Sequence, residues 1–159
     1  MDYKEVLRQH LVKLLNGRQA HAAFDDIVDG IPADLRGARH PGVVHTPWQI
    51  VEHLRIAQWD ILEFSRDPHH ESPAFPQGYW PETETPPDPD AWDRSVDAFR
   101  SDLAEMQSFV SDPSTDLFAE IAWGSGQTVL REALLIADHN SYHLGELVLL
   151  RRLLGIWPA

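Results

Sequence analysis

The chain has 159 residues, of which 43% are hydrophobic and 24% charged, a composition typical of one globular domain with its own core and not of a disordered chain. Its 25 acidic and 13 basic residues give a formal net charge of −12, which argues against nucleic acid and anionic membranes as partners. There is no cysteine, which excludes disulfides and thiolate ligands and leaves histidine, aspartate and glutamate for chemistry.

The N-terminal segment is charged and amphipathic, and no later stretch approaches the roughly 18 uncharged apolar residues of a membrane span. We therefore expect a cytoplasmic protein. Between Leu7 and Ile31, apolar residues recur in steps of three, four and seven, which predicts one amphipathic helix over about 3–29, ended by Gly30. The stretch 32–46 has no helical period and is expected to be a connector.

A second helix begins with a clear capping signal. Thr46 has the character of an N-cap, Pro47 suits the first helical position, and Gln49 follows three residues after the threonine, as in a capping box. The apolar face behind this signal also carries His53. The pattern predicts a helix that ends near Arg66.

The segment 67–89 holds seven of the twelve prolines and three aromatic residues, Phe75, Tyr79 and Trp80, which excludes a helix or a central strand. So long a run is a binding loop or a crossover. Its length suffices to return along a helix of about 30 Å, which favours parallel helices on either side of it. It could cover a cavity as a lid, although a packed surface crossover is the simpler interpretation.

Two further helices follow. Apolar periodicity predicts the third over 92–110, and Thr128 can cap a fourth that runs to Leu154 with Gly155 as its stop. The fourth helix is apolar on nearly every side and should be the most buried. Neither strand alternation nor an internal repeat is found. We therefore predict an all-α fold in one domain over 1–159, a four-helix bundle with a long crossover between helices two and three.

Six hydrogen-bonding residues, 138–143, interrupt the apolar fourth helix. Unpaired buried polar groups cost about 1–3 kcal/mol each, so these residues require partners. His139 and His143 lie four residues apart and share one helix face, where they could bind one cation together with His53 from the second helix. They could equally be core histidines that bond to Asp138, Glu52 or the backbone, and spacing alone does not decide between the two.

The remaining polar residues suggest lesser roles. His21 lies on the stripe of the first helix and is interpreted as a core or boundary histidine. Glu146, one turn beyond His143, could reach a metal or act as a base, but a supporting role is more common. Ser141 has no helical neighbour arranged as a general base, which argues against a serine hydrolase. Asp138 and Asn140 should point away from a site that His139 faces. The loop histidines are expected to be solvated: His40, His45, His69 and His70.

Four segments, 46–53, 57–60, 137–145 and 149–155, resemble the DinB-like (YfiT-like) superfamily of metal-dependent proteins. The resemblance covers nearly the whole chain. It implies a four-helix bundle in up-down-down-up order and a divalent metal, often nickel or zinc. The implied ligands are one histidine of helix two and a pair on helix four, at the positions of His53, His139 and His143. The superfamily includes transferases and isomerases that use low-molecular-weight thiols such as bacillithiol or mycothiol, and homodimers are common in it.

The leading hypothesis is a metal-dependent enzyme, either a hydrolase or a thiol-dependent transferase, acting on a small molecule. A divalent cation could lower the pKa of bound water or of a bound thiol. The alternative is a non-catalytic stress protein that binds a metal or a small ligand, and in a third reading the three histidines only stabilise the core. The substrate, the native metal and the oligomeric state do not follow from the sequence. The candidate pocket residues are Trp59, Asp60, Tyr79, Trp80, Trp123 and Tyr142.

Overall fold

The computed structural model describes residues 2–158, and over this range it contains helices and two isolated bridges but no β-strand. The all-α prediction is confirmed. The α-helices are α1 (Tyr3–Leu15), α2 (Phe24–Val28), α3 (Pro47–Arg66), α4 (Ala91–Ser111) and α5 (Val129–Leu153), and two short 3₁₀ turns, η1 (Ala33–Leu35) and η2 (Gln77–Tyr79), lie between them.

The single helix predicted over 3–29 is wrong, because the chain leaves the helix after Leu15 and forms α2 only from Phe24. Gly17 has a φ of +81°, a left-handed conformation that ends helices and that glycine adopts without strain. The apolar stripe is shared by the two shorter helices, since Leu11 of α1 and Ile27 of α2 are both buried. Periodicity alone could not reveal the break.

The other helix boundaries are confirmed to within one or two residues. The hydroxyl of Thr46 accepts from the Gln49 backbone N–H at 3.2 Å, and the Gln49 side chain accepts from the Thr46 N–H at 3.1 Å, which completes the predicted capping box. Thr128 caps α5 by accepting from the backbone N–H of Arg131, and Gly155 beyond its end has a φ of +72°.

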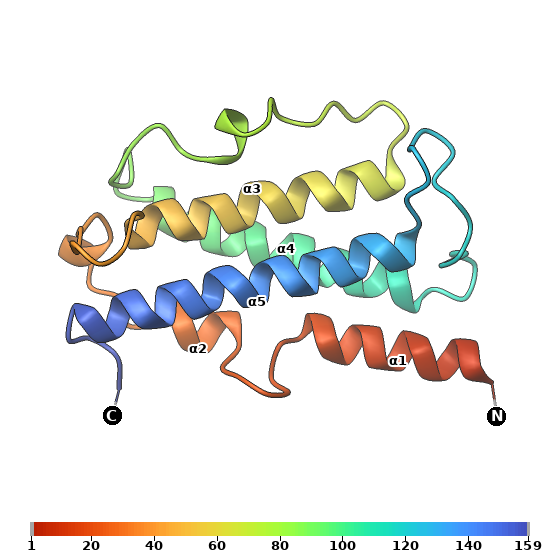
Figure 1. The fold of residues 1–159 in the computed structure, drawn as a ribbon, viewed down its shortest axis with the longest axis horizontal. Coiled ribbons are helices and arrows are strands. Elements are labelled where there is room, and N and C mark those ends of the chain that lie inside the picture. The colour runs from red at the N-terminus through yellow and green to blue at the C-terminus, as the bar shows by residue number, and fades with distance from the viewer. Residues whose placement is uncertain (1, 159) are drawn as a thin grey trace.

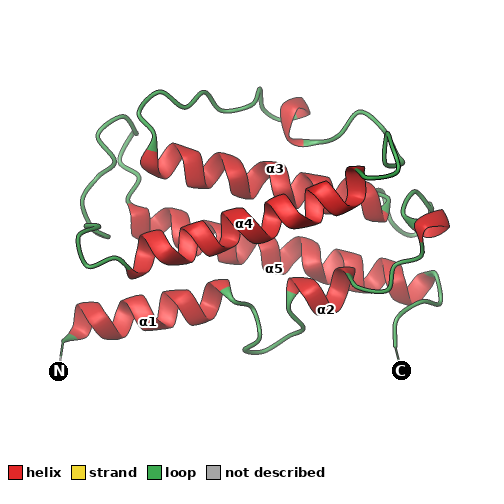
Figure 2. Cartoon of the chain, turned by 180° about the vertical axis from the view of Figure 1, so that it is seen from behind, coloured by secondary structure: helices red, strands yellow, loops and turns green. Residues whose placement is uncertain are grey.

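The long helices lie side by side (Figure 1). Followed from red to blue, α3 and α4 run in one direction, whereas α1 and α5 run in the other, and the crossover between α3 and α4 returns over the outside of α3. The reverse view shows α1 and α2 as two pieces along one side of the molecule (Figure 2). α3 packs against both α4 and α5, and α1 packs against α4 and α5.

A polar layer separates two apolar clusters in the core. One cluster contains Leu54, Phe99 and Leu147, and the other contains Leu62 and Met106. Between them, on α3 and α5, lie the fully buried Gln58 and the largely buried Asn140, which are joined by a 2.9 Å hydrogen bond from the Asn140 amide to Gln58 Oε1. The Gln58 amide donates in turn to the Phe99 carbonyl on α4 at 2.7 Å. The histidines on α3 and α5 lie at the edge of this layer.

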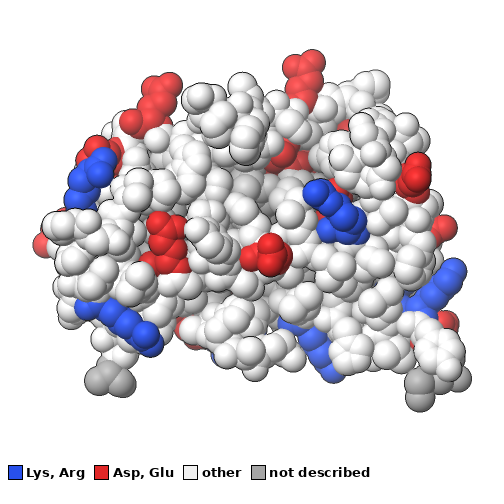
Figure 3. All heavy atoms as spheres, viewed as in Figure 1, with Lys and Arg blue, Asp and Glu red and all other residues white. Residues whose placement is uncertain are grey.

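The surface carries both signs of charge. On the face shown in Figure 3 the Lys and Arg side chains are separated from one another and interspersed with Asp and Glu. Among the described helices, none combines the length and the apolar character that a membrane crossing would require.

Candidate metal centre

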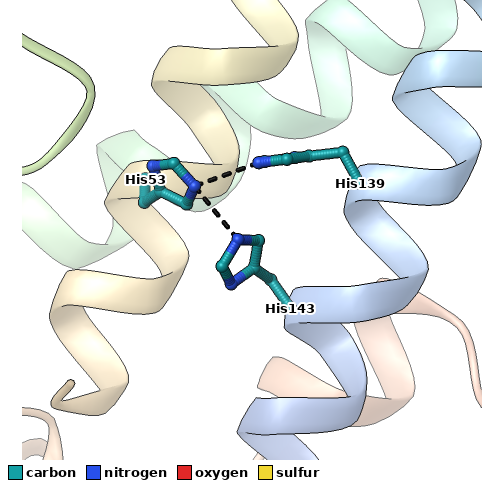
Figure 4. Close-up of side chains that lie close together, drawn as sticks. All are labelled: His53, His139 and His143. Carbon is teal, nitrogen blue, oxygen red and sulfur yellow. Dashed lines mark hydrogen bonds between the residues drawn. The ribbon is translucent and has the colours of Figure 1, made fainter. Parts of the chain in front are cut away.

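The side chain of His53 on α3 points toward those of His139 and His143 on α5 (Figure 4). Nε2 of His53 lies 3.0 Å from Nε2 of His139 and 3.1 Å from Nε2 of His143. Each ring offers one nitrogen, and the three nitrogens all lie within 4.8 Å of one another. The three predicted ligands are therefore brought together by two helices that pack directly on each other.

Two of the three spacings, those from His53 to each of its partners, are compatible with a shared divalent ion. Metal–imidazole distances of about 2.0–2.1 Å separate two ligand nitrogens by about 3.0 Å when the angle between them is near 90–95°. The His53 nitrogen meets this condition with both of its partners. Three neutral imidazoles on one side of an ion leave coordination positions for water or a substrate atom, as in catalytic sites.

Two of the rings, those of His53 and His143, form hydrogen bonds through Nδ1, and these bonds show which nitrogen of each ring is free to bind a metal. Nδ1 of His53 donates to the carbonyl oxygen of Tyr79 at 2.8 Å, and Nδ1 of His143 donates to Glu146 Oε2 at 3.0 Å. Because a carbonyl and a carboxylate only accept, Nδ1 of each ring carries a hydrogen, and in a neutral imidazole this leaves the lone pair on Nε2. Two such lone pairs that face each other at 3.1 Å repel unless a cation lies between them. The donor set therefore fits a divalent metal.

His139 is held less firmly than the other two rings. Its Nδ1 is buried and has no hydrogen-bond partner, and Oδ1 of the adjacent Asn140 is likewise buried and unpaired. Each unpaired buried polar atom costs about 1–3 kcal/mol in the free energy of folding. Stability alone therefore does not explain a histidine at this position.

Burial keeps the rings of His53 and His139 in the form that binds a metal. It lowers the pKa of His53 to about 4, and the neighbouring histidines add to this against the opposing bond to the Tyr79 carbonyl. Burial likewise lowers the pKa of His139 to about 4, aided by His143. Both rings are therefore uncharged at neutral pH. The bond from His143 lowers the pKa of Glu146, which stays a carboxylate.

Glu146 links the centre to a fourth histidine. Its Oε1 accepts from Nδ1 of His45 at 3.1 Å while its other oxygen holds His143. The indole of Trp80 lies between the rings of His45 and His53, with centroids 3.9 and 3.8 Å away. The prediction that His45 is solvated is wrong, because this loop residue is half-buried and paired. The supporting role considered for Glu146 is the one its contacts fit.

Asp60 ties the crossover to α3. Its Oδ1 accepts from Nε2 of His70 at 2.7 Å, and its Oδ2 accepts from the hydroxyl of Tyr79 at 2.6 Å. The prediction that His70 is solvated is wrong, since only 7% of its side chain is exposed. Tyr79 also supplies the carbonyl that orients His53. The crossover is thus fastened along its length and forms part of the support of the centre.

The other sequence candidates lie outside the cluster. His21 is exposed, contrary to the interpretation as a core or boundary residue, and its Nε2 is 3.2 Å from Oγ of Ser141. That hydroxyl donates to the Ala137 carbonyl at 2.7 Å, so its proton is committed to the helix backbone. His40 is half-buried and accepts from the Gly42 N–H, whereas His69 is exposed.

A cleft of about 450 Å³ adjoins His53 and His139, within the range of about 300–1,000 Å³ common for small-molecule sites. Of the predicted pocket residues, Asp60, Tyr79 and Trp80 line it, whereas Trp59, Trp123 and Tyr142 do not. The full lining is His53, Ala57, Asp60, Ile61, Phe75, Pro76, Tyr79, Trp80, Leu135 and His139.

The family model described as the DinB superfamily matches residues 17–147, which include all three histidines and most of α5. The match covers more than half of the chain, so the chain belongs to this superfamily. Neither a curated protein nor a solved structure matches the chain.

Proposed function

We propose that this DinB-superfamily protein is a metal-dependent enzyme in which His53, His139 and His143 hold one divalent cation. The observation that carries the proposal is the convergence of three imidazole nitrogens, from the buried His53 and His143 and the half-buried His139. The rings of His53 and His143 are oriented by outward hydrogen bonds to Tyr79 and Glu146. Imidazole suits both nickel and zinc. The long helices are assigned the up-down-down-up order of the superfamily, and a homodimer is expected from the same resemblance. A cytoplasmic location is expected from the sequence pattern.

When bound, the cation would lower the pKa of a ligated water or thiol and so supply a nucleophile that a chain without cysteine lacks. The protein's own residues would position and shield this centre. Glu146 and the Tyr79 carbonyl fix the orientation of two rings, and Trp80 covers one face of His53 against solvent. The neighbouring cleft would hold a small-molecule substrate, and hydrolysis or thiol transfer could use the same centre.

A second candidate is a protein that binds a metal or a small ligand without catalysis. One observation favours it: both carboxylate oxygens of Asp60, the acidic residue in the cleft, already accept hydrogen bonds. A general base would have to come from the metal-bound water or from the substrate.

Metal content tests what the two candidates share. Protein purified without a metal-affinity tag is analysed by inductively coupled plasma mass spectrometry, before and after exposure to nickel or zinc. We expect close to one ion per chain, and loss of binding in His143→Ala but not in His69→Ala, which changes an exposed loop histidine. No bound metal and no uptake would reject both candidates.

Catalysis is then separated from binding by assaying thiol conjugation and ester or amide hydrolysis in the wild type and in His139→Ala. An enzyme should lose its activity in the variant, whereas equal rates would favour the non-catalytic candidate. The core-histidine reading makes a different prediction. It requires each alanine change to lower the melting temperature equally with and without a chelator, whereas a metal site makes the chelator destabilise only the wild type.

A further inference from the structure

We infer that the cleft beside His53 and His139 binds an uncharged, apolar part of the substrate, while a ligand atom of the same molecule occupies an open position on the metal. This inference rests on the proposed function and narrows it to a class of substrate. It is drawn from the composition of the cleft, from the state of its polar groups and from its position beside the centre.

The walls of the cleft are apolar on every element that forms it. Ala57 and Ile61 come from α3, Leu135 comes from α5, and Phe75 and Pro76 come from the crossover. Burying an apolar group against such walls is favourable by about 25 cal/mol per Å² of surface removed from water. Phe75 is 85% exposed at present, so apolar surface remains available to a ligand.

The carboxylate and the phenol of the cleft, from Asp60 and Tyr79, are already engaged in hydrogen bonds. Asp60 accepts two hydrogen bonds, one on each oxygen, from His70 and Tyr79. The hydroxyl of Tyr79 is committed in turn, because it donates its proton to Asp60 Oδ2 at 2.6 Å. A polar part of a substrate would therefore compete with His70 and Tyr79 for the carboxylate of Asp60.

No basic side chain among the described residues that line the cleft would compensate a negative charge on the part of the substrate bound there. There is no Lys or Arg among these described residues, and the whole chain carries a formal charge of −12. A buried charge without a partner is strongly disfavoured. The two metal-ligand histidines of the lining place the cleft directly beside the centre, so a molecule bound to the ion through sulfur or oxygen would extend its remainder along the apolar walls.

The experiment uses cobalt-loaded full-length protein and three thiol probes of different character: phenylmethanethiol, 2-mercaptoethanesulfonate and 2-aminoethanethiol. Thiolate binding to cobalt is read from the charge-transfer band in the near ultraviolet, with each dissociation constant corrected for the thiol's own pKa. We expect phenylmethanethiol to bind at least about tenfold more tightly than either charged probe.

A pair of adjacent leucines on α5 supplies matched variants. Leu135 is half-buried and lines the cleft, whereas Leu134 is 45% exposed and does not. Leu135→Lys should weaken phenylmethanethiol and strengthen 2-mercaptoethanesulfonate, each several-fold, because it adds the missing positive charge. Leu134→Lys should leave the order of the three probes as in the wild type.

The outcomes separate this inference from the proposed function. If the wild type fails to hold cobalt, nickel or zinc, the proposed function fails. If cobalt is held but the three thiols bind equally, or the charged ones bind more tightly, or none produces the band, the metal centre stands and the apolar-substrate inference is overturned. If Leu135→Lys and Leu134→Lys changed the affinities for the three thiols equally, the apolar-substrate inference would be overturned as well.

Discussion

The carboxylate of Glu146 holds the ring of His143 by accepting from its Nδ1 at 3.0 Å, one helical turn along α5. A carboxylate in this position fixes the tautomer of a ligand histidine and raises its basicity. Its second oxygen holds His45, from the connector before α3. One side chain thus anchors both the candidate ligand and the loop whose imidazole stacks on Trp80.

The first prediction follows from this pair. Glu146→Gln removes the negative charge that supports His143, and outer partners of this kind are worth about 10–100-fold in metal affinity. We expect a loss of that size in zinc affinity, measured by competition with a chromophoric chelator. Glu71→Gln, which changes an exposed acidic residue of the crossover, should bind zinc as the wild type does. Unchanged affinity in Glu146→Gln would show that this carboxylate does not support a ligand.

The second prediction concerns the buried amides. Gln58→Leu leaves the Asn140 amide without its acceptor and removes the extra bond to the Phe99 carbonyl, which keeps its own helical bond. Asn140→Leu leaves Gln58 Oε1 unpaired, so each variant should lower the free energy of unfolding by about 1–3 kcal/mol. The double variant removes both side-chain partners and should be less destabilised than the sum of the two. Urea unfolding of the metal-free protein measures the coupling. Strict additivity would mean that the two amides do not stabilise each other.

Local signals in the sequence accounted for most of the helices. The capping box at Thr46 and the stop at Gly155 involve residues a few positions apart, which is why these boundaries are confirmed. The break after Leu15 was not predicted, because the apolar stripe continues into α2 and a single glycine inside a periodic segment is a weak signal. Gly17 ends the helix through its backbone conformation, which periodicity does not report.

The three candidate ligands could be predicted, whereas their support could not. His139 and His143 are four residues apart and His53 lies on the buried face of its own helix, so local pattern made them candidates, and the resemblance to the superfamily implied them as ligands. Glu146 reaches His45 across 101 positions, and Tyr79 reaches His53 across 26. Such contacts depend on how the connector and the crossover fold back over α3, and loop sequences carry no periodicity that would indicate it.

The third prediction concerns Asp102 of α4. Burial, together with repulsion by Glu105, raises the pKa of this carboxyl to about 6 from 3.8. The native state therefore keeps a proton that the unfolded chain has lost between about pH 4 and 6, so this group makes stability fall as the pH rises through that window. Asp102→Asn removes the effect.

We expect Asp102→Asn to raise the melting temperature by roughly 1–4 °C at pH 7.5 and to have little effect at pH 4, as followed by circular dichroism. The matched change Asp97→Asn, at an exposed position of the same helix, should give no such pH-dependent gain. A gain of equal size at both pH values would assign the effect to helix propensity or packing and not to the proton.

The fourth prediction uses Trp80 as a reporter of the metal. Its indole stacks on His53 with ring centroids 3.8 Å apart, the closest approach of an aromatic ring to a candidate ligand. Open-shell ions such as nickel or cobalt quench nearby indoles, so their addition should lower the tryptophan fluorescence, whereas closed-shell zinc should not. Trp80→Phe keeps the stacked ring and should abolish most of the quenching.

Trp123→Phe is the matched control. The indole of Trp123 donates to the Phe64 carbonyl near the end of α3, about 16 Å along the helix axis from His53 at about 1.5 Å per residue. This variant should be quenched as strongly as the wild type. Quenching that survives in Trp80→Phe and is lost in Trp123→Phe would place the ion near the end of α3, away from the three histidines, because one indole lies against the proposed ligands and the other does not.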